Sequence, residues 1–239
     1  YEEEMKKVQA VLTRSSLYLR IEEEGMDGEA WEKLWKEAKV AQRQKGYQQA
    51  YRSMEAAVKE TEGEMLFYQS KVCEGVFHRI SSGATRDGLE VFGKMEKGYL
   101  LSVDSNWDMY GDGYLSGHYF SEEALREQLE KAYPELVFTQ EPLEKQINMH
   151  KRDKVGHILS LTVGNKTISG EEFRQLLELP SSNFTMQATD RKIRFLCKGQ
   201  GHGLGLSQYG GNVLAREGKS YQEILRYYFP ECEVKTKKS

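Results

Sequence analysis

Glycine alternates with larger residues in one short segment near the carboxyl-terminal end, GQGHGLGLSQYGG at positions 199–211. Side chains alternate between the two faces of an extended segment, so one face here carries none, while His202 projects from the other. Ser207 stands where its hydroxyl can cap a following helix. The segment therefore predicts either a tight structural corner between strand and helix or a place where backbone approaches a ligand closely. The alternating glycines are Gly199, Gly201, Gly203 and Gly205.

Two phosphate-binding interpretations of this segment are excluded. A Walker loop needs Lys followed by Ser or Thr at a fixed spacing after its glycines, and a dinucleotide fingerprint needs a strand, three spaced glycines and a helix. Neither pattern is present in the chain.

Helical and strand patterns follow one another without regular alternation. Apolar residues at helical spacing predict helices, and runs rich in β-branched and aromatic residues between Gly and Pro predict strands. This order favours an α+β fold, in which irregularly interleaved helices and mixed or antiparallel strands surround a central cleft. The expected helices are 4–21, 29–61 with a break near Gly46, 122–133, 169–177, a helix ending at Gly218, and 221–228, and the expected strands lie within 65–81, 155–163, 184–186 and 192–197.

The chain is long enough to bury a sizeable core, and we expect a single domain over residues 1–239. Its expected sub-lobes are a helical part at 1–64, a middle part at 65–150, and a part at 151–239 that carries the glycine-rich segment.

Composition excludes some functions. The net charge is −3, and the 34 basic and 37 acidic residues are interspersed, so no broad cationic surface for nucleic acid is predicted. No run of about 18 apolar residues and no signal-peptide pattern occurs, so we expect a soluble chain. Tyr1 leads directly into a helical pattern, which favours an upstream segment that was removed, and an anchor is a candidate for that segment.

Metal binding is the less favoured chemistry. The candidate ligands are Cys73 with His78, and Cys197 with His202 and Cys232, but no CxxC or HExxH pattern joins them. Cysteine in an apolar strand is most often a small core residue. We therefore expect no cofactor, with zinc as the alternative, and three cysteines cannot close a complete disulfide framework.

Glu4 lies at the start of the first expected helix, with Val8 four residues and Val11 seven residues further on. Its side chain is therefore expected along the apolar stripe, where burial would raise the pKa of the carboxyl and suit it to donate a proton near neutral pH. The alternative is structural, because any acidic residue in a first turn complements the helix dipole.

Three segments, in order, resemble the stage II sporulation protein D (SpoIID/LytB) family, and the likeness covers nearly the whole chain. The family's opening helix reads roughly E-A-L-K-A-Q-A-V-A-A-R-T-Y, and its middle segment leads through A-V-x-x-T-x-G to an S-G-G-x-T loop. Its closing segment, the most specific, is G-x-G-x-G-H-G-x-G-M-S-Q-x-G-A followed by G-x-S-Y-x-E-I-L-x-x-Y-Y. The corresponding segments here are EMKKVQAVLTRSS from Glu4, AAVKETEGEMLFYQSKVCEGVFHRISSGATRD from Ala56, and KGQGHGLGLSQYGGNVLAREGKSYQEILRYY from Lys198.

The resemblance implies a lytic transglycosylase that cleaves between N-acetylmuramic acid (MurNAc) and N-acetylglucosamine (GlcNAc) in peptidoglycan, with Glu4 at the position of the single catalytic glutamate. One carboxyl would protonate the glycosidic oxygen and then accept the proton of the muramic 6-hydroxyl as that oxygen attacks, leaving a 1,6-anhydro end. It also implies an extracytoplasmic, membrane-anchored protein of sporulation and engulfment, with glycan strands, a cell-wall amidase and a membrane protein as partners. The alternatives are a noncatalytic wall-binding or amidase-enhancing protein and a scaffold in a membrane complex.

Further residues at matching positions are expected to line the substrate cleft, where sugars need hydrogen-bond donors and aromatic faces. Trp107 and Tyr110 are further candidates for stacking on sugar rings. Some clostridial relatives hold zinc near the S-G-G-x-T loop, but no cysteine follows Ser81 here, so the metal is not carried over. The chain departs from the family at Ser16, usually aromatic, and within residues 29–53. The substrate-binding residues implied by the resemblance are Arg14, Ser81, Ser82, Thr85, His202, Ser207, Gln208 and Tyr209.

Overall fold

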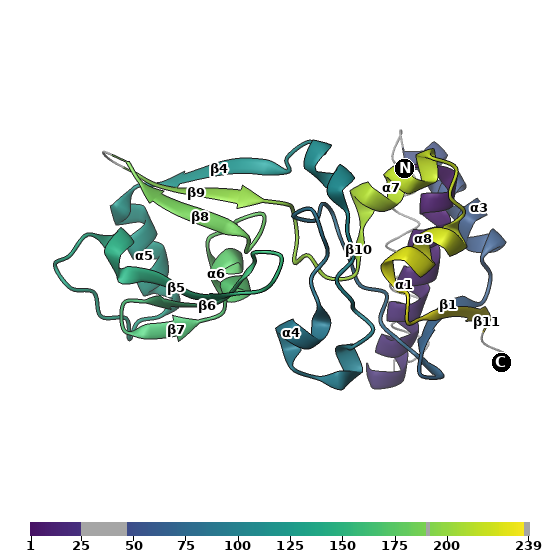
Figure 1. The fold of residues 1–239 in the computed structure, drawn as a ribbon, viewed down its shortest axis with the longest axis horizontal. Coiled ribbons are helices and arrows are strands. Elements are labelled where there is room, and N and C mark those ends of the chain that lie inside the picture. The colour runs from purple at the N-terminus through teal and green to yellow at the C-terminus, as the bar shows by residue number, and fades with distance from the viewer. Residues whose placement is uncertain (25–46, 190–191, 237–239) are drawn as a thin grey trace. The chain divides into compact units, whose positions relative to one another are not determined.

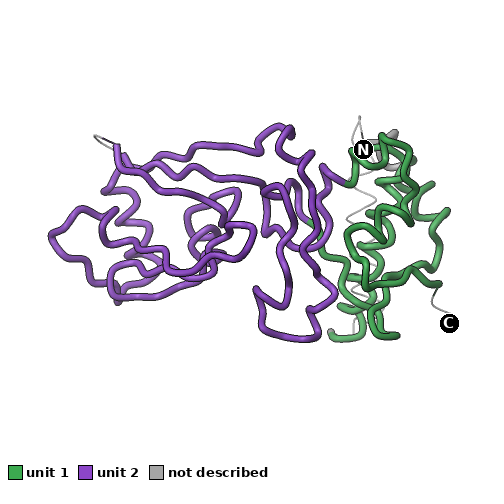
Figure 2. Tube along the Cα trace, viewed as in Figure 1, with its two compact units in different colours: residues 1–77, 211–239 green, residues 78–210 purple. Residues whose placement is uncertain are grey.

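The computed structural model describes residues 1–24, 47–189 and 192–236. They form two compact units (Figure 2). Unit 1 is made of residues 1–77 and 211–239, and unit 2 of residues 78–210. The part of the expected second helix from 29 to 46 lies outside the described residues.

Unit 1 is built around α1 (Glu3–Glu24), the first expected helix. Its apolar face is fully buried at Met5, Val8, Val11 and Leu12. That face packs against α3 (Tyr47–Glu60), α8 (Tyr221–Tyr228) and β1 (Glu64–Tyr68), as Figure 1 shows. The antiparallel sheet of this unit has the order β11 (Glu233–Thr236), β1, β2 (Lys71–Val72).

One glycine fixes how closely the chain passes α1. A Cβ atom on Gly75 would lie 2.2 Å from the carbonyl oxygen of Leu12, so only glycine fits there. Ser16 occupies the position where the family usually has an aromatic residue. Its hydroxyl accepts a hydrogen bond from the Gly75 N–H at 3.0 Å. Ser16 thus fastens the Gly75 backbone to α1.

The larger part of unit 2 consists of two antiparallel sheets with helices α5 and α6 and one hydrophobic core. Phe173, Phe184 and Phe195 meet at the centre of that core, with ring centroids 5.4 to 5.8 Å apart. The sheets and helices are β4 (Leu115–Phe120), β9 (Ile193–Lys198) and β8 (Phe184–Ala188); β5 (Ile147–Arg152), β6 (Ile158–Val163) and β7 (Lys166–Ile168); α5 (Glu122–Ala132); and α6 (Gly170–Leu176).

One loop of unit 2 lies against the glycine-rich segment. Bridges from Ile80 to Gln200 and from Arg86 to Leu204 hold the loop SSGATRDG against it. The short elements are β3 (Phe77–His78), α4 (Gly88–Phe92), the 3-10 helices η1 (Met95–Lys97), η2 (Asn106–Tyr110) and η3 (Leu143–Gln146), β10 (Leu206–Ser207) and α7 (Gln208–Arg216).

The expected α+β class is confirmed. Ser121 caps α5 by accepting from the Ala124 N–H, and Ser169 and Ser220 each form a capping box, so the predicted helix starts rest on real hydrogen bonds. The strands β4, β5, β7 and β11 lie outside the expected ranges. No helix among the described ranges 1–24, 47–189 and 192–236 is long and apolar enough to cross a membrane.

Candidate functional site

The predicted site residues divide between the two units. Glu4 and Arg14 lie on α1 in unit 1, and the candidates from Ser81 to Tyr209 lie in unit 2. The candidates of each unit have their own chemistry.

The Glu4 carboxylate is held by two donors at fixed positions. One oxygen accepts from Lys7 Nζ at 2.6 Å, and the other accepts from the backbone N–H of Tyr221 at 2.8 Å. Tyr221 is the first residue of α8, where free N–H groups and the helix dipole favour a negative charge. The Glu4 side chain nevertheless keeps 30% of its surface exposed, so a fixed carboxylate faces solvent.

Lys7 extends this cluster. Its ammonium group also bonds to Glu60 at 2.8 Å and lies 5.9 Å from the centre of the Tyr221 ring. The Tyr221 hydroxyl donates to Glu64 at 3.0 Å. The result is a network in which one lysine bridges two carboxylates beside a tyrosine.

The expected pKa of Glu4 was wrong in direction. Burial does act to raise the pKa of Glu4, but the Lys7 hydrogen bond, the Tyr221 backbone hydrogen bond and the Lys7 charge together lower it below its usual value. The predicted pKa took into account only the apolar residues beside Glu4. It did not include Lys7, which is three residues away on the same face of α1. The resting carboxyl is therefore charged at neutral pH.

Arg14 holds the end of α3 together with the start of β1. Its guanidinium donates to the carbonyl oxygens of Thr61 at 2.7 Å, of Glu64 at 2.8 Å and of Val58 at 3.1 Å. Burial lowers the pKa of Arg14, against the nearby Glu64 charge. The Arg14 guanidinium thus binds backbone carbonyl oxygens, which gives Arg14 a structural role in unit 1.

The glycine-rich corner in unit 2 needs its glycines. Gly199, Gly201, Gly203 and Gly205 all have positive φ angles, from 67° to 106°. A Cβ on Gly201 would lie 2.8 Å from the Cβ of His78, and one on Gly203 would lie 2.9 Å from Nε2 of His157. The segment is thus a tight corner packed against two histidines, as one of the two sequence interpretations predicted.

His202 in this corner is partly exposed, whereas His78 and His157 are buried. The His78 and His202 rings have centroids 5.8 Å apart. Burial, followed by the charge of His202, lowers the pKa of His78 to about 3, and burial followed by the Arg86 charge holds the pKa of His157 well below its usual value. Both buried imidazoles are therefore neutral at physiological pH.

The serine and threonine candidates of the SSGATRDG loop are mostly occupied by internal bonds. The Ser81 N–H donates to Asp108 at 2.7 Å, and burial raises the pKa of Asp108. Thr85 is buried and bonds to the backbone of Leu101 and Val103. Ser82 is more accessible than Ser81 and Thr85, and its hydroxyl lies 3.4 Å from Nε2 of His157.

Ser207, Gln208 and Tyr209 follow the corner at the start of α7. Ser207 is fully buried, and its hydroxyl accepts from the Gly210 N–H at 3.3 Å, which confirms its predicted capping role. Gln208 and Tyr209 keep partly exposed side chains. The Tyr209 ring packs beside Gly111, where a Cβ would approach it to 3.2 Å.

The aromatic residues proposed for sugar stacking differ in exposure. Tyr110 is 83% exposed, whereas Trp107 is only partly accessible. Of the two, Tyr110 offers the open aromatic face.

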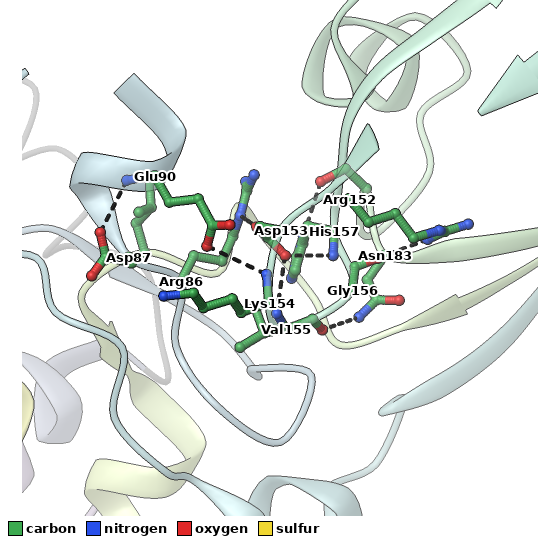
Figure 3. Close-up of polar contacts among 12 residues, drawn as sticks. Arg86, Asp87, Glu90, Arg152, Asp153, Lys154, Val155, Gly156, His157 and Asn183 are labelled. Carbon is green, nitrogen blue, oxygen red and sulfur yellow. Dashed lines mark hydrogen bonds and ion pairs between the residues drawn. The ribbon is translucent and has the colours of Figure 1, made fainter. Parts of the chain in front are cut away.

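A buried ion pair that no sequence pattern indicated supports the corner. Arg86 Nε donates to Asp153 at 2.5 Å, and both side chains are almost fully buried. The same guanidinium donates to the carbonyl oxygen of His202 at 3.1 Å, and the Arg86 N–H donates to that of Gly203. Figure 3 shows Arg86 facing Asp153, with the backbone N–H of His157 on the same carboxylate. Arg86 thus ties the corner to the turn at 153–157.

His78, a candidate metal ligand of the sequence, has its Nδ1 2.9 Å from the Leu204 carbonyl oxygen. Within the described parts of the chain, no group of three or more His, Cys, Asp or Glu side chains is arranged to hold a metal ion.

Sequence reasoning missed Lys7, Glu60 and Tyr221 as members of the Glu4 cluster. Lys7 and Tyr221 lie within the segments that carry the family resemblance, so motif position was an available signal for both. Asp153 lies in no motif, and its role follows only from the coordinates.

No family model matches the chain. Among curated proteins, the stage II sporulation protein D of Bacillus amyloliquefaciens is 29% identical over 197 residues, which are 79% of this chain and 52% of the relative. The stage II sporulation protein D of Bacillus subtilis is 27% identical over 189 residues, again 79% of this chain and 52% of the relative. An amidase enhancer of Bacillus subtilis is 42% identical over 50 residues, 21% of this chain and 7% of that protein.

The chain thus spans about half the length of the curated relatives that it matches most extensively. The two relatives share one description, stage II sporulation protein D. Together with the three family segments in the same order along the sequence, these matches support membership of the stage II sporulation protein D family.

Proposed function

We propose that this chain is the catalytic part of a lytic transglycosylase that cleaves MurNAc–GlcNAc bonds in peptidoglycan glycan strands during sporulation. In the reaction, the protonated Glu4 carboxyl gives its proton to the glycosidic oxygen. The muramic 6-hydroxyl then attacks the anomeric carbon, and its proton passes to the Glu4 carboxylate. The products are a GlcNAc leaving end and a 1,6-anhydro muramic end, and no water is consumed.

The observation that carries the proposal is the fixed and partly exposed carboxyl of Glu4. One of its oxygens is anchored on the Tyr221 N–H at 2.8 Å, so the direction of the carboxyl is set by the start of α8. A general acid must be positioned this way, because misplacement of the donor by about 1 Å costs about a hundredfold in rate.

The Lys7 bond determines when Glu4 can act as an acid. While Lys7 donates to Glu4, the pKa of Glu4 is lowered and the carboxyl has no proton to give. Lys7 has a second partner in Glu60 at 2.8 Å. A glycosidic oxygen that takes the place of Lys7 beside Glu4 would leave the lysine on Glu60 and let the pKa of Glu4 rise toward working pH.

The substrate sets the expected location and partners. Peptidoglycan lies outside the cytoplasmic membrane, so the chain would act there, tethered by a membrane segment outside this sequence. The partners proposed with this function are a cell-wall amidase and a membrane protein of the engulfment machinery.

A second candidate function is a noncatalytic protein that binds the wall or enhances an amidase. Its support is the stretch of 50 residues that is 42% identical to an amidase enhancer. The charged resting state of Glu4 also suits a purely structural carboxylate, which only links α1 to α8.

One assay separates the two functions. Purified protein is incubated with glycan strands stripped of stem peptides, and the released ends are identified by mass spectrometry, because an anhydro end is lighter than a reducing end by one water. The comparison uses Glu4→Gln and the matched variant Glu3→Gln, whose exposed side chain lies one residue earlier on α1. The catalytic proposal requires anhydro ends from wild type and Glu3→Gln but not from Glu4→Gln, whereas no anhydro ends from any of the three supports the noncatalytic function.

A further inference from the structure

Two cysteines of unit 1 lie next to each other although they are far apart in sequence. Cys73 follows β2, and Cys232 precedes β11. Their sulfur atoms are 3.7 Å apart, and the residues are separated by 159 positions. Both thiols are free in this structure.

The surroundings of the two thiols differ. Cys73 is buried, with its N–H on the Leu66 carbonyl oxygen at 2.9 Å and its sulfur 3.6 Å from the same oxygen. Cys232 is partly exposed and lines a surface groove of about 510 Å³ beside α8 and β11. A small reagent can thus react first with Cys232, because Cys73 is buried.

We propose that Cys73 and Cys232 are a redox site at which this protein forms an intramolecular disulfide. The oxidant is another disulfide, either of a small thiol such as glutathione or of a thiol oxidoreductase. The Cys232 thiolate attacks the oxidant, forms a mixed disulfide and releases one reduced thiol. The Cys73 thiolate then attacks the Cys232 sulfur, forms the internal bond and releases the second thiol, so the protein gives up two electrons and two protons.

Geometry favours this pair over any pair with Cys197. Sulfur atoms in a disulfide are about 2.05 Å apart, so side-chain rotation has to close the present gap. Cys197 is fully buried on β9 in the core of unit 2. A bond to it would need that core to open.

The disulfide would stabilise the part of unit 1 that carries Glu4. Cys232 lies shortly after the end of α8 at Tyr228, and the first N–H of α8 is the one that holds the Glu4 carboxylate. A cross-link between residues this distant removes much of the freedom of the unfolded chain, and the effect grows with loop length. Oxidation would therefore fix α8 and β11 against β1 and β2.

The reaction should be slow at neutral pH. The hydrogen bond with Cys73, followed by burial, raises the pKa of the Cys232 thiol, so little of it is the reactive thiolate. Raising the pH should accelerate the first step.

The test uses the full chain as it is, incubated with glutathione disulfide. Remaining thiols are alkylated after denaturation, the protein is digested, and linked peptides are identified by mass spectrometry, while thermal unfolding is recorded before and after reduction. We expect a linked Cys73–Cys232 peptide, an alkylated Cys197, and a melting temperature raised by about 5–15 °C that reduction reverses.

Variants sharpen the result. Cys197→Ser should keep both the link and the thermal shift, Cys232→Ser should lose both, and Cys73→Ser should leave Cys232 as a stable mixed disulfide with glutathione. Three alkylated thiols in oxidised wild type, a link to Cys197, or a Cys73–Cys232 link without a thermal shift would each overturn the proposal. None of these outcomes depends on glycan cleavage, so they do not bear on the proposed function.

Discussion

The Glu4 cluster in unit 1 and the glycine-rich corner in unit 2 use ionisable side chains in opposite ways. Around Glu4, the side chains of Lys7 and Glu60 are partly exposed, at 18% and 56%. Lys7 forms ion pairs with both Glu4 and Glu60. In the corner, the buried imidazole of His78 is held neutral, and the ion pair of Arg86 with Asp153 is almost completely buried.

The difference separates a network that can rearrange from one that cannot. Exposed pairs of charges contribute about 0–1 kcal/mol each, so exchanging one partner for a substrate is inexpensive. Removing one partner of a buried pair leaves an uncompensated charge in the interior and costs about 3–5 kcal/mol. Unit 1 is therefore suited to proton transfer, and the corner of unit 2 is suited to holding a backbone shape.

The largest expected effect comes from breaking the buried pair. Arg86→Met removes the partner of Asp153 and the donor to the His202 carbonyl oxygen, and it should destabilise unit 2 by about 3–5 kcal/mol. Denaturant unfolding followed by tryptophan fluorescence measures the change.

The matched variant is Lys145→Met in the same unit. Lys145 pairs with Glu141 at 3.4 Å, but both side chains are 65% exposed, so the loss should stay below about 1 kcal/mol. Similar losses for the two variants would contradict the distinction drawn between buried and exposed pairs.

A smaller effect follows from the neutral histidines. The pKa of His78 is about 3 in the folded chain, below the ordinary value of 6.5, so the unfolded chain takes up a proton first as pH falls. The stability that His78 contributes is therefore complete above pH 6.5 and is lost as the pH falls from there toward 3. The loss is about 1.4 kcal/mol per pH unit, or about 2–3 kcal/mol between pH 7 and pH 4.5.

The measurement is the free energy of unfolding at several pH values for wild type and for His78→Asn, whose amide can replace the Nδ1 bond to Leu204. The variant should lose less stability on acidification than wild type. Substitution of the exposed His150 by Asn should leave the acid dependence as it is in wild type. An acid dependence of His78→Asn as steep as that of wild type would show that His78 is not buried as a neutral base.

The smallest effect on stability is expected at Lys7. Lys7→Met should change the free energy of unfolding by less than about 1 kcal/mol, since the pair is partly exposed. It should, however, raise the pKa of Glu4, because the Lys7 hydrogen bond and charge are what lower it. A general acid works only while protonated, so the alkaline limb of the pH profile of glycan cleavage should move to higher pH.

Lys6→Met is the matched control for Lys7. The Lys6 ammonium bonds to Ser53 at 2.5 Å instead of to Glu4, so this variant should keep the wild-type pH profile. An alkaline limb that stays in place in Lys7→Met, with cleavage otherwise intact, would separate Lys7 from the titration of Glu4.

Local patterns predicted much of this fold. The helices α1, α5, α6 and α8 were predicted because their apolar spacing, together with the Ser121 cap of α5, depends on neighbouring residues. The strands β4 and β11 were not, because their pairing with β9 and β1 is decided by distant segments.

The candidate site shows the same limit. The family motif favoured Glu4, the alternating glycines pointed to the glycine-rich corner, and the Ser207 cap followed from local sequence. The state of Glu4 did not follow, because its pKa depends on Tyr221, a residue 217 positions away, as well as on Lys7. Likewise, Asp153 meets Arg86 across 67 positions without any shared pattern.

The most direct test of the central claim is the rate at which anhydro muramic ends accumulate on stripped glycan strands with wild type and with Glu4→Gln. Gln keeps an acceptor for the Tyr221 N–H but has no proton to exchange with the sugar. The account predicts a loss of about 10²–10⁴-fold in this rate with little change in thermal stability. Equal rates for the two proteins would contradict it and leave Glu4 as a structural link between α1 and α8.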